Sequence, residues 1–161
     1  MCIRDSVIDG GTALTLTGAN SNGRLVGGAI LPGIALQLRS LTEATPLPAI
    51  RPSEQVPPRW AHNTVDAILS GVLYTIWAGL ADFIQSWSRD YTTSNIVLTG
   101  GDYQRIYQGL RAFRSRAYSS MERAAAMIEH GQEPWQDRLV CDETLLFQGI
   151  QRLRVKRLES Q

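Results

Sequence analysis

The amino-acid sequence predicts a single α/β domain, and three observations support this fold class. Strand patterns with a period of two fill residues 7–31, a long helical pattern with a period near 3.6 covers residues 63–87, and another short apolar strand follows at residues 95–99. A chain of 161 residues is long enough to bury one ordinary core. Strands and helices that alternate in this way are typical of layered α/β domains.

The first predicted element is a three-stranded meander. An apolar pair at Val7–Ile8 leads into two glycines, and residues 13–17 (ALTLT) then alternate between apolar and polar positions. The sequence NSNG at residues 20–23 has the composition of a turn. A third strand is predicted over residues 24–33, where Pro32–Gly33 ends it.

Helices and a further strand follow the meander. Residues 34–41 have helical spacing, and residues 45–58 contain five prolines, which predict an irregular loop. Asn63 can cap a helix with Asp66 as its capping-box partner, and apolar residues then recur with helical period to about Trp87.

The remaining elements are shorter or more polar. The apolar run at residues 95–99 predicts a buried strand that enters a glycine turn. Residues 103–130 have a polar helical pattern in two pieces, residues 137–140 (DRLV) predict a last short strand, and residues 143–158 a terminal helix. On the long helix, Gly71, Thr75 and Gly79 form a stripe of small residues that another backbone could approach closely.

Composition excludes several classes of protein. A content of 43% hydrophobic and 19% charged residues is typical of soluble globular proteins, and a net charge of +1 gives no electrostatic basis for binding nucleic acid or anionic lipid. Cys2 and Cys141 lack the spacing of a metal or redox motif. No apolar run is expected to approach the length needed to span a bilayer and no signal peptide is recognisable, so we expect a cytoplasmic protein.

The first six residues, MCIRDS, carry neither a strand nor a helix pattern. We therefore expect residues 1–6 to be a non-native start and residues 7–161 to form the domain.

The sequence DGGT at residues 9–12 is the first motif with a chemical interpretation. Glycines let backbone N–H groups approach phosphate oxygens, and a threonine hydroxyl adds a neutral donor. A carboxylate beside phosphate is reasonable only if a cation lies between them. The alternative is a plain hairpin turn.

The sequence TGGD at residues 99–102 is a second glycine turn, between a strand and a helix. The amino end of a helix favours negative charge, and glycines leave room for a base or a ribose. The alternative is an ordinary connection without a ligand.

Two further motifs are weaker. Paired glycines in GGAILPG, residues 27–33, indicate that something approaches the strand, although a simple sheet terminus is the alternative. In HNT, residues 62–64, the simplest interpretation is a helix cap, while an exposed Thr64 hydroxyl could bind a polar ligand. His62 has no second metal ligand nearby, and the basic run at residues 152–157 is best explained as a solvated helix end.

Taken in order, DGGTALTLTG, GGAILPG, HNT and TGGD resemble the C-terminal half of the type III pantothenate kinases over residues 7–102, and LLFQGI at residues 145–150 resembles the closing segment of that family. The resemblance implies a ribonuclease-H-like domain of the actin-like (ASKHA) kinase superfamily, in which two such domains enclose a nucleotide. DGGT would be the second phosphate motif, at the start of the C-terminal domain. On this resemblance, the N-terminal half of the enzyme would be missing from this chain.

The resemblance also implies roles for individual residues. Asp9 would help to hold a monovalent cation, K⁺ or NH₄⁺. The ATP-binding residues would be Gly10, Gly11 and Thr12 at the phosphates and Gly100 and Gly101 beside the adenosine. Gly28, Asn63 and Thr64 would contact pantothenate. The complete protein would be a cytoplasmic homodimer that phosphorylates pantothenate to 4′-phosphopantothenate with ATP and Mg²⁺, the first step of coenzyme A biosynthesis.

The chain departs from the family pattern in four places. It lacks the first phosphate motif and the glycine-x-aspartate-arginine motif that carries the proposed catalytic base, so no catalytic residue is expected in this chain and the fragment alone should be inactive. Ala61–His62 replaces a glycine followed by a basic residue, and residues 103–137 form a longer segment than the family predicts.

Two alternatives to this function stay open. The chain could be a non-catalytic paralogue that acts as a regulatory or binding module, like the Bvg accessory factors. It could also belong to another actin-like kinase that acts on a different small alcohol.

Overall fold

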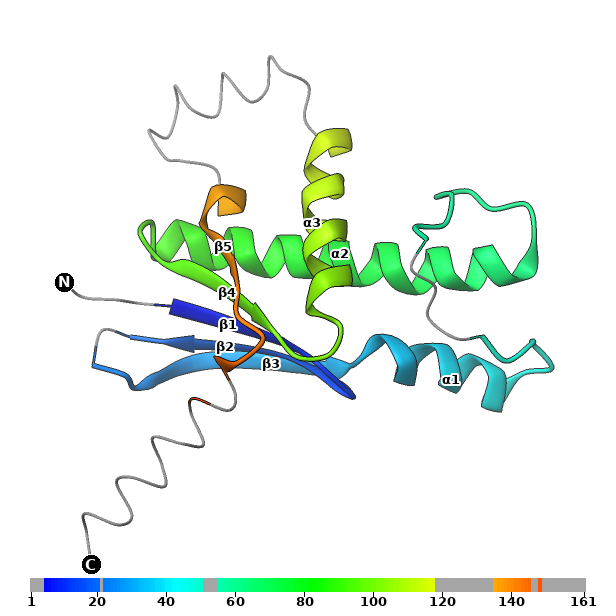
Figure 1. The fold of residues 1–161 in the computed structure, drawn as a ribbon, viewed down its shortest axis with the longest axis horizontal. Helices are drawn as coiled ribbons and strands as arrows, with labels where there is room; N and C mark the ends of the chain where they lie inside the picture. Colours follow the sequence, from blue (N-terminus) through cyan, green and yellow to red (C-terminus); the bar gives the residue numbers. More distant parts are fainter. Residues whose placement is uncertain (1–4, 21, 51–54, 118–134, 146–147, 149–161) are drawn as a thin grey trace, which may run out of the picture.

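The computed structural model describes residues 5–20, 22–50, 55–117, 135–145 and 148 of the chain. Its centre is a five-stranded mixed sheet (Figure 1). Three strands form the predicted meander: β1 (Asp5–Gly10), β2 (Ala13–Ala19) and β3 (Leu25–Pro32). β4 (Asn95–Thr99) lies parallel to β1, and β5 (Leu139–Cys141) lies parallel to β4, which gives the order β3-β2-β1-β4-β5.

The central strand begins earlier than predicted, at Asp5 rather than Val7. Asp5 and Ser6 carry no apolar alternation, but both pair with β2 on one side and with β4 on the other. The Asp5 carboxylate also accepts a hydrogen bond from the Asn95 backbone N–H at 3.3 Å. The extension therefore comes from the length of the neighbouring strands, which a local sequence pattern does not reveal.

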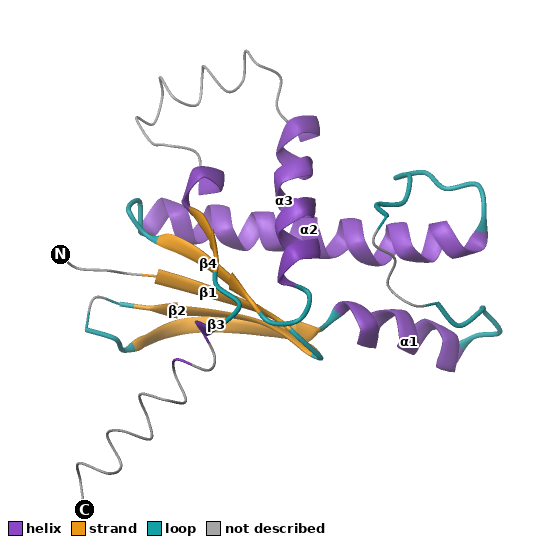
Figure 2. Cartoon of the chain, viewed as in Figure 1, coloured by secondary structure: helices purple, strands orange, loops and turns teal. Residues whose placement is uncertain are grey.

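Helices in the described residues follow the predicted order: α2 runs along one face of the sheet, and α1 continues from the end of β3 beyond the strands and packs beside α2 (Figure 2). α1 (Ile34–Ala44) extends beyond the expected end at Leu41, and α2 (Thr64–Asp90) is a rod of 27 residues. The predicted cap of α2 is confirmed: the Asn63 side-chain oxygen accepts from the Asp66 N–H at 2.9 Å. The apolar face of α2 is buried against the strands, with Ile76, Leu80 and Ile84 each no more than 2% exposed.

α3 (Tyr103–Ala117) packs across α2 (Figure 1). The contact is close because Gly109 lies directly on the Trp77 ring, where an added β-carbon would be 1.9 Å from the indole Cε2. Trp77 is 1% exposed, so this tryptophan belongs to the core of the chain itself. The predicted helical pattern over residues 103–130 is confirmed as far as Ala117, and the rest of it lies outside the described residues.

The small-residue stripe on α2 faces outward. Gly71, Thr75 and Gly79 are all exposed, and a β-carbon built on either glycine would meet nothing within 4 Å in the described part of the chain. No described element of this chain packs closely on either glycine.

The expectation that no apolar run reaches the length of a membrane span is wrong for α2, which is long and apolar enough by length and composition alone. Its most apolar window has a mean hydropathy of 1.6, and 56% of that window is buried inside the fold. Core helices of soluble proteins have the same property, so length and composition are weak evidence for a membrane here.

The predicted strand at residues 137–140 is shifted. A 3₁₀ turn covers Trp135–Arg138, and β5 begins only at Leu139. The Arg138 guanidinium explains the turn, since it donates to the backbone carbonyls of Thr92 at 2.6 Å and Ser94 at 2.9 Å, before β4. Most of the predicted terminal helix over residues 143–158 lies outside the described residues, as does most of LLFQGI.

Candidate functional site

The two glycine motifs lie together at the carboxyl ends of β1 and β4. The strands are parallel neighbours, and Asp9 is in register with Thr99. The turn after β4 folds over the end of β1, because the Asp102 N–H donates to the Gly10 carbonyl at 2.8 Å. The carboxyl edge of parallel strands is the usual place for a ligand in open α/β sheets. We call this cluster, residues 9–12 with 99–102, the β1–β4 edge.

Asp9 and Gly100 form the tightest contact of the β1–β4 edge. Gly100 has a φ of +87°, a conformation that side chains rarely adopt, and a β-carbon there would be 2.2 Å from Asp9 Oδ1. The Asp9 carboxylate therefore lies against the backbone at the end of β4. Asp9 is half-buried, and its side chain has no hydrogen bond or ion pair with any residue that the structure describes.

The four glycines of these motifs have different roles. Gly10 is buried, and a β-carbon there would be 2.6 Å from Ile106 Cδ1, so close packing explains this glycine as fully as a ligand would. A β-carbon on Gly11 would make only ordinary contacts, and one on Gly101 would meet nothing within 4 Å. Gly11 and Gly101 are thus the positions where the turns leave space beside the backbone.

Two threonines flank the glycines in opposite environments. Thr12 is exposed, and its hydroxyl has no partner within the described ranges, so it is available to a ligand. Its carbonyl accepts from the Gly33 N–H at 2.9 Å, which joins the DGGT turn to the end of β3. Thr99 is 3% exposed, and its Oγ1 is buried with no hydrogen-bond partner among the residues described.

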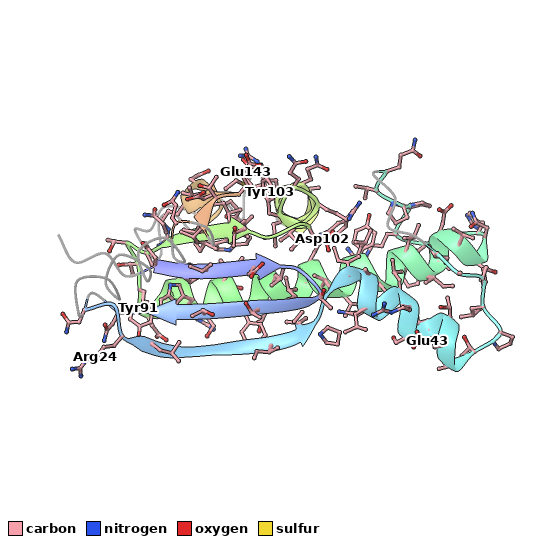
Figure 3. The ribbon with its side chains drawn as sticks, turned by 60° about the horizontal axis from the view of Figure 1, so that its bottom comes forward. Arg24, Glu43, Tyr91, Asp102, Tyr103 and Glu143 are labelled. Atoms are coloured by element: carbon pink, nitrogen blue, oxygen red, sulfur yellow. The ribbon has the colours of Figure 1, made fainter. Side chains whose placement is uncertain are left out.

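A second carboxylate, that of Asp102, lies at the start of α3 (Figure 3). Arg105 pairs with it at 2.8 Å, and both side chains are about four-fifths buried. Tyr103, beside Asp102, reaches Glu143 near the end of β5, where its hydroxyl is 3.4 Å from Oε2. Asp102 is therefore already balanced by a cation, whereas Asp9 is not.

The predicted pantothenate residues Asn63 and Thr64 lie elsewhere. Both line a shallow hollow between the end of α1 and the start of α2, together with Leu41, His62 and Ile68. Both polar atoms of the Asn63 side chain are engaged in the cap, since its Nδ2 also donates to Asp66 Oδ2 at 2.7 Å. Thr64 is exposed, so its hydroxyl is available to a polar ligand at the start of α2.

Gly28 lies at a third place, in the middle of the edge strand β3. A β-carbon there would be 2.2 Å from the Leu16 carbonyl oxygen, so the close approach that its glycine pair predicted is to the neighbouring strand β2. Gly28 lines a groove with Phe83 and Trp87 of α2. The hollow at Asn63 and Thr64 shares no lining residue with this groove, nor with the β1–β4 edge.

Three residues at or beside the β1–β4 edge, Thr99, Gly33 and Arg105, have no individual role in the sequence-based prediction, although Thr99 and Gly33 belong to the motifs TGGD and GGAILPG. Gly33 is packed so closely that a β-carbon would be 1.9 Å from the Gly11 carbonyl oxygen. The sequence pattern places Thr99 only in the turn, before the glycine pair. The register of β1 and β4 shows that Thr99 lies on the same face of the sheet as Asp9.

Other reactive groups do not gather at a site. In the part of the chain that the structure describes, no group of three or more His, Cys, Asp and Glu residues could hold a metal ion. Cys141, at the end of β5, is a free cysteine, and partial burial raises the pKa of its thiol, which disfavours the thiolate.

Comparisons with known sequences all indicate the same family. The model of the type III pantothenate kinase family matches residues 5–86. The chain is 52% identical over 108 residues to a type III pantothenate kinase of Synechococcus sp. (strain JA-3-3Ab), a match that covers 65% of this chain and 44% of the relative. It is 38% identical over 148 residues to one of Nostoc sp. (strain PCC 7120), covering 90% and 47% respectively.

The chain thus spans about half the length of the curated relatives it matches. Among solved structures, a protein from Campylobacter jejuni that is assigned to the Baf family of transcriptional activators shares the fold, with a TM-score of 0.56. That match covers 97% of this chain and 59% of the other, at 22% sequence identity.

Proposed function

Because the chain belongs to the type III pantothenate kinase family, we propose that it is the C-terminal half of an enzyme that transfers the γ-phosphate of ATP to pantothenate. The product would be 4′-phosphopantothenate, and the reaction would be the first step of coenzyme A biosynthesis. One structural observation supports this function most directly: residues 9–12 and 99–102, far apart in the sequence, meet at the carboxyl edge of β1 and β4.

The fold supports a ribonuclease-H-like assignment within the actin-like kinases. The meander β1–β3 is followed by helices, and β4 and β5 then extend the sheet parallel to β1. In this proposal the C-terminal domain includes Asp5 and Ser6, which pair in β1, as well as residues 7–161, and the first phosphate motif and the catalytic base belong to an N-terminal half. The 161-residue chain alone would therefore be inactive.

The environment of Asp9 fits a monovalent cation. Its carboxylate has no partner in the described part of the chain, the Arg105 side chain is already bound to Asp102, and a buried hydroxyl without a partner lies in register with it. Oxygen ligands of this kind suit K⁺ or NH₄⁺, whose charge would offset repulsion between the carboxylate and ATP. Mg²⁺ would enter with ATP.

The remaining proposed roles follow the geometry of the β1–β4 edge. Thr12 would donate its free hydroxyl to an ATP phosphate, with Gly10 and Gly11 shaping the turn, and Gly100 and Gly101 would lie beside the adenosine. Phosphoryl transfer depends mainly on positioning and charge neutralisation, which are the contributions that these residues can make. Thr64, Asn63 and Gly28 would belong to the pantothenate side.

We also propose a cytoplasmic homodimer. Grooves between β3 and α2 are lined by apolar side chains, and Phe83, which is 48% exposed, lines two of them. The outward stripe of Gly71, Thr75 and Gly79 adjoins these grooves. Trp77, although it lies on α2, would not take part in this interface, since it is buried within a single chain.

The function is tested by a steady-state assay of the enzyme restored to full length from its source gene. We expect phosphorylation of pantothenate that requires K⁺ or NH₄⁺ and is weak in Na⁺. Asp9→Asn should weaken the cation dependence and raise the KM for ATP, while the KM for pantothenate stays nearly constant. Thr64→Ala should raise the KM for pantothenate and leave the KM for ATP nearly unchanged.

The assay also separates the alternatives. A full-length protein that binds ATP but phosphorylates no alcohol would favour the non-catalytic module, and activity on another small alcohol would favour a different actin-like kinase. If Asp9→Asn keeps the wild-type cation dependence, Asp9 is only a turn residue.

A further inference from the structure

We infer that Thr99 positions the Asp9 carboxylate, and that its buried hydroxyl donates a hydrogen bond to this carboxylate when a monovalent cation is bound. The inference rests on the proposed role of Asp9 as the residue that holds the cation. Thr99 would act through Asp9 and would not itself contact the cation.

The first observation is the environment of the Thr99 hydroxyl. Thr99 is 3% exposed, and its Oγ1 has no hydrogen-bond partner in the part of the chain that is described. Buried hydroxyl groups in native proteins almost always have a partner, so one without a partner calls for an explanation. A packing role alone would be met better by valine, which has the same shape and no polar atom.

The second observation is the register of β1 and β4. Asp9 and Thr99 are direct partners in the parallel pair, so their side chains leave the sheet on the same face. Neighbouring strands lie about 4.8 Å apart, and a side-chain rotation therefore brings the hydroxyl within reach of the carboxylate. The Asp9 carboxylate already leans towards β4, since its Oδ1 lies against Gly100.

The third observation is that Asp9 also has no partner in the described residues. A carboxylate that binds a cation usually accepts a hydrogen bond from an outer group, which fixes the orientation of the oxygen that faces the cation. An arginine or lysine in that position would cancel the negative charge, whereas a threonine hydroxyl orients the carboxylate and leaves its charge for the cation. Thr99 meets this requirement.

The test is a potassium titration of the full-length enzyme in the presence of MgATP, with KCl replacing NaCl at constant ionic strength. The readout is the midpoint of thermal unfolding, which needs no pantothenate and no turnover. For the wild type we expect the midpoint to rise with K⁺. Thr99→Val should weaken the apparent K⁺ affinity by roughly 10- to 100-fold, as is typical for an outer partner of a ligand.

Two further variants separate positioning from packing. Thr99→Ser retains the hydroxyl and should restore most of the K⁺ response even if it loosens the packing. Thr17→Val removes an exposed threonine from the same face, in register with Val7, and should leave the response unchanged. In Na⁺ alone, Thr99→Val should unfold at the wild-type midpoint or above it, because it removes a buried hydroxyl that lacks a partner.

A wild-type K⁺ response that Thr99→Val retains would overturn the inference, and so would a wild type without any K⁺ response. The first result bears on the inference alone, whereas the second would also contradict the proposed cation role of Asp9. Phosphoryl transfer to pantothenate is scored separately by the steady-state assay. If the response needs Thr99 but the full-length enzyme phosphorylates no pantothenate, the inference stands and the proposed function fails.

Discussion

Each of the two glycine motifs contains one packed and one open glycine. Gly10 and Gly100 fit closely against neighbouring atoms, whereas a β-carbon on Gly11 would make only ordinary contacts and one on Gly101 would meet nothing within 4 Å. The packed glycines are explained by the fold alone. The open ones have no such explanation within the described chain, and they are where a bound nucleotide would meet the backbone.

We therefore expect Gly101→Ala to change ligand binding without changing stability. The free energy of unfolding should stay within about 0.5 kcal/mol of the wild type, as for other surface substitutions, while ATP affinity should fall about tenfold if the adenosine lies on Gly101. Calorimetric titration of the full-length enzyme with ATP measures this. Gly27→Ala, at another open glycine, is the matched control, and equal ATP affinity in both variants would remove Gly101 from the ATP site.

The close contact of α2 with α3 is possible because α3 has a glycine, Gly109, where it meets the Trp77 ring. A methyl group at Gly109 would overlap the Trp77 ring, and overpacking of a core typically costs about 1–3 kcal/mol. Gly109→Ala should therefore lower the free energy of unfolding by about 2 kcal/mol in urea denaturation. Gly71→Ala, also a helical glycine but with open space around it, should raise it by up to about 1 kcal/mol because alanine favours the helix. The opposite result for either variant would contradict the described packing.

Whether an element could be predicted from the sequence depended on whether its causes are local. The cap at Asn63 and the apolar period of α2 are local, and both were predicted correctly. The start of β1 at Asp5 and the turn at Trp135–Arg138 depend on pairing and hydrogen bonds with distant segments, and both were missed. The same holds for Thr99, since only the register of two strands places it beside Asp9.

At the scale of the whole molecule, the predicted site residues divide among three places. The β1–β4 edge, the hollow at Asn63 and Thr64, and the groove at Gly28 share no residues. The order of the motifs along the chain does not predict this separation. Thr64 is the first residue of α2, a helix of 27 residues that is about 40 Å long.

The proposed dimer is tested at Phe83. Phe83→Arg places a charge in the apolar grooves between α2 and β3, so a dimer that uses them should dissociate, and sedimentation velocity would detect the monomer. Val140→Arg adds the same charge at another exposed apolar residue, on β5, and should leave the dimer intact. A wild-type protein that sediments as a monomer would refute the proposal, as would a Phe83→Arg protein that stays dimeric.

The pairing of β1 with β4 also determines when the β1–β4 edge can exist during folding. The hydrogen bond from Asn95 to Asp5 joins residues that are ninety positions apart, whereas β1, β2 and β3 pair through short turns. Closing so long a loop costs chain entropy before any contact compensates for it, and such pairings form slowly. A nascent chain can therefore complete its meander early, but it acquires the β1–β4 edge only after the segment between β3 and β4 has been synthesised and β4 has docked.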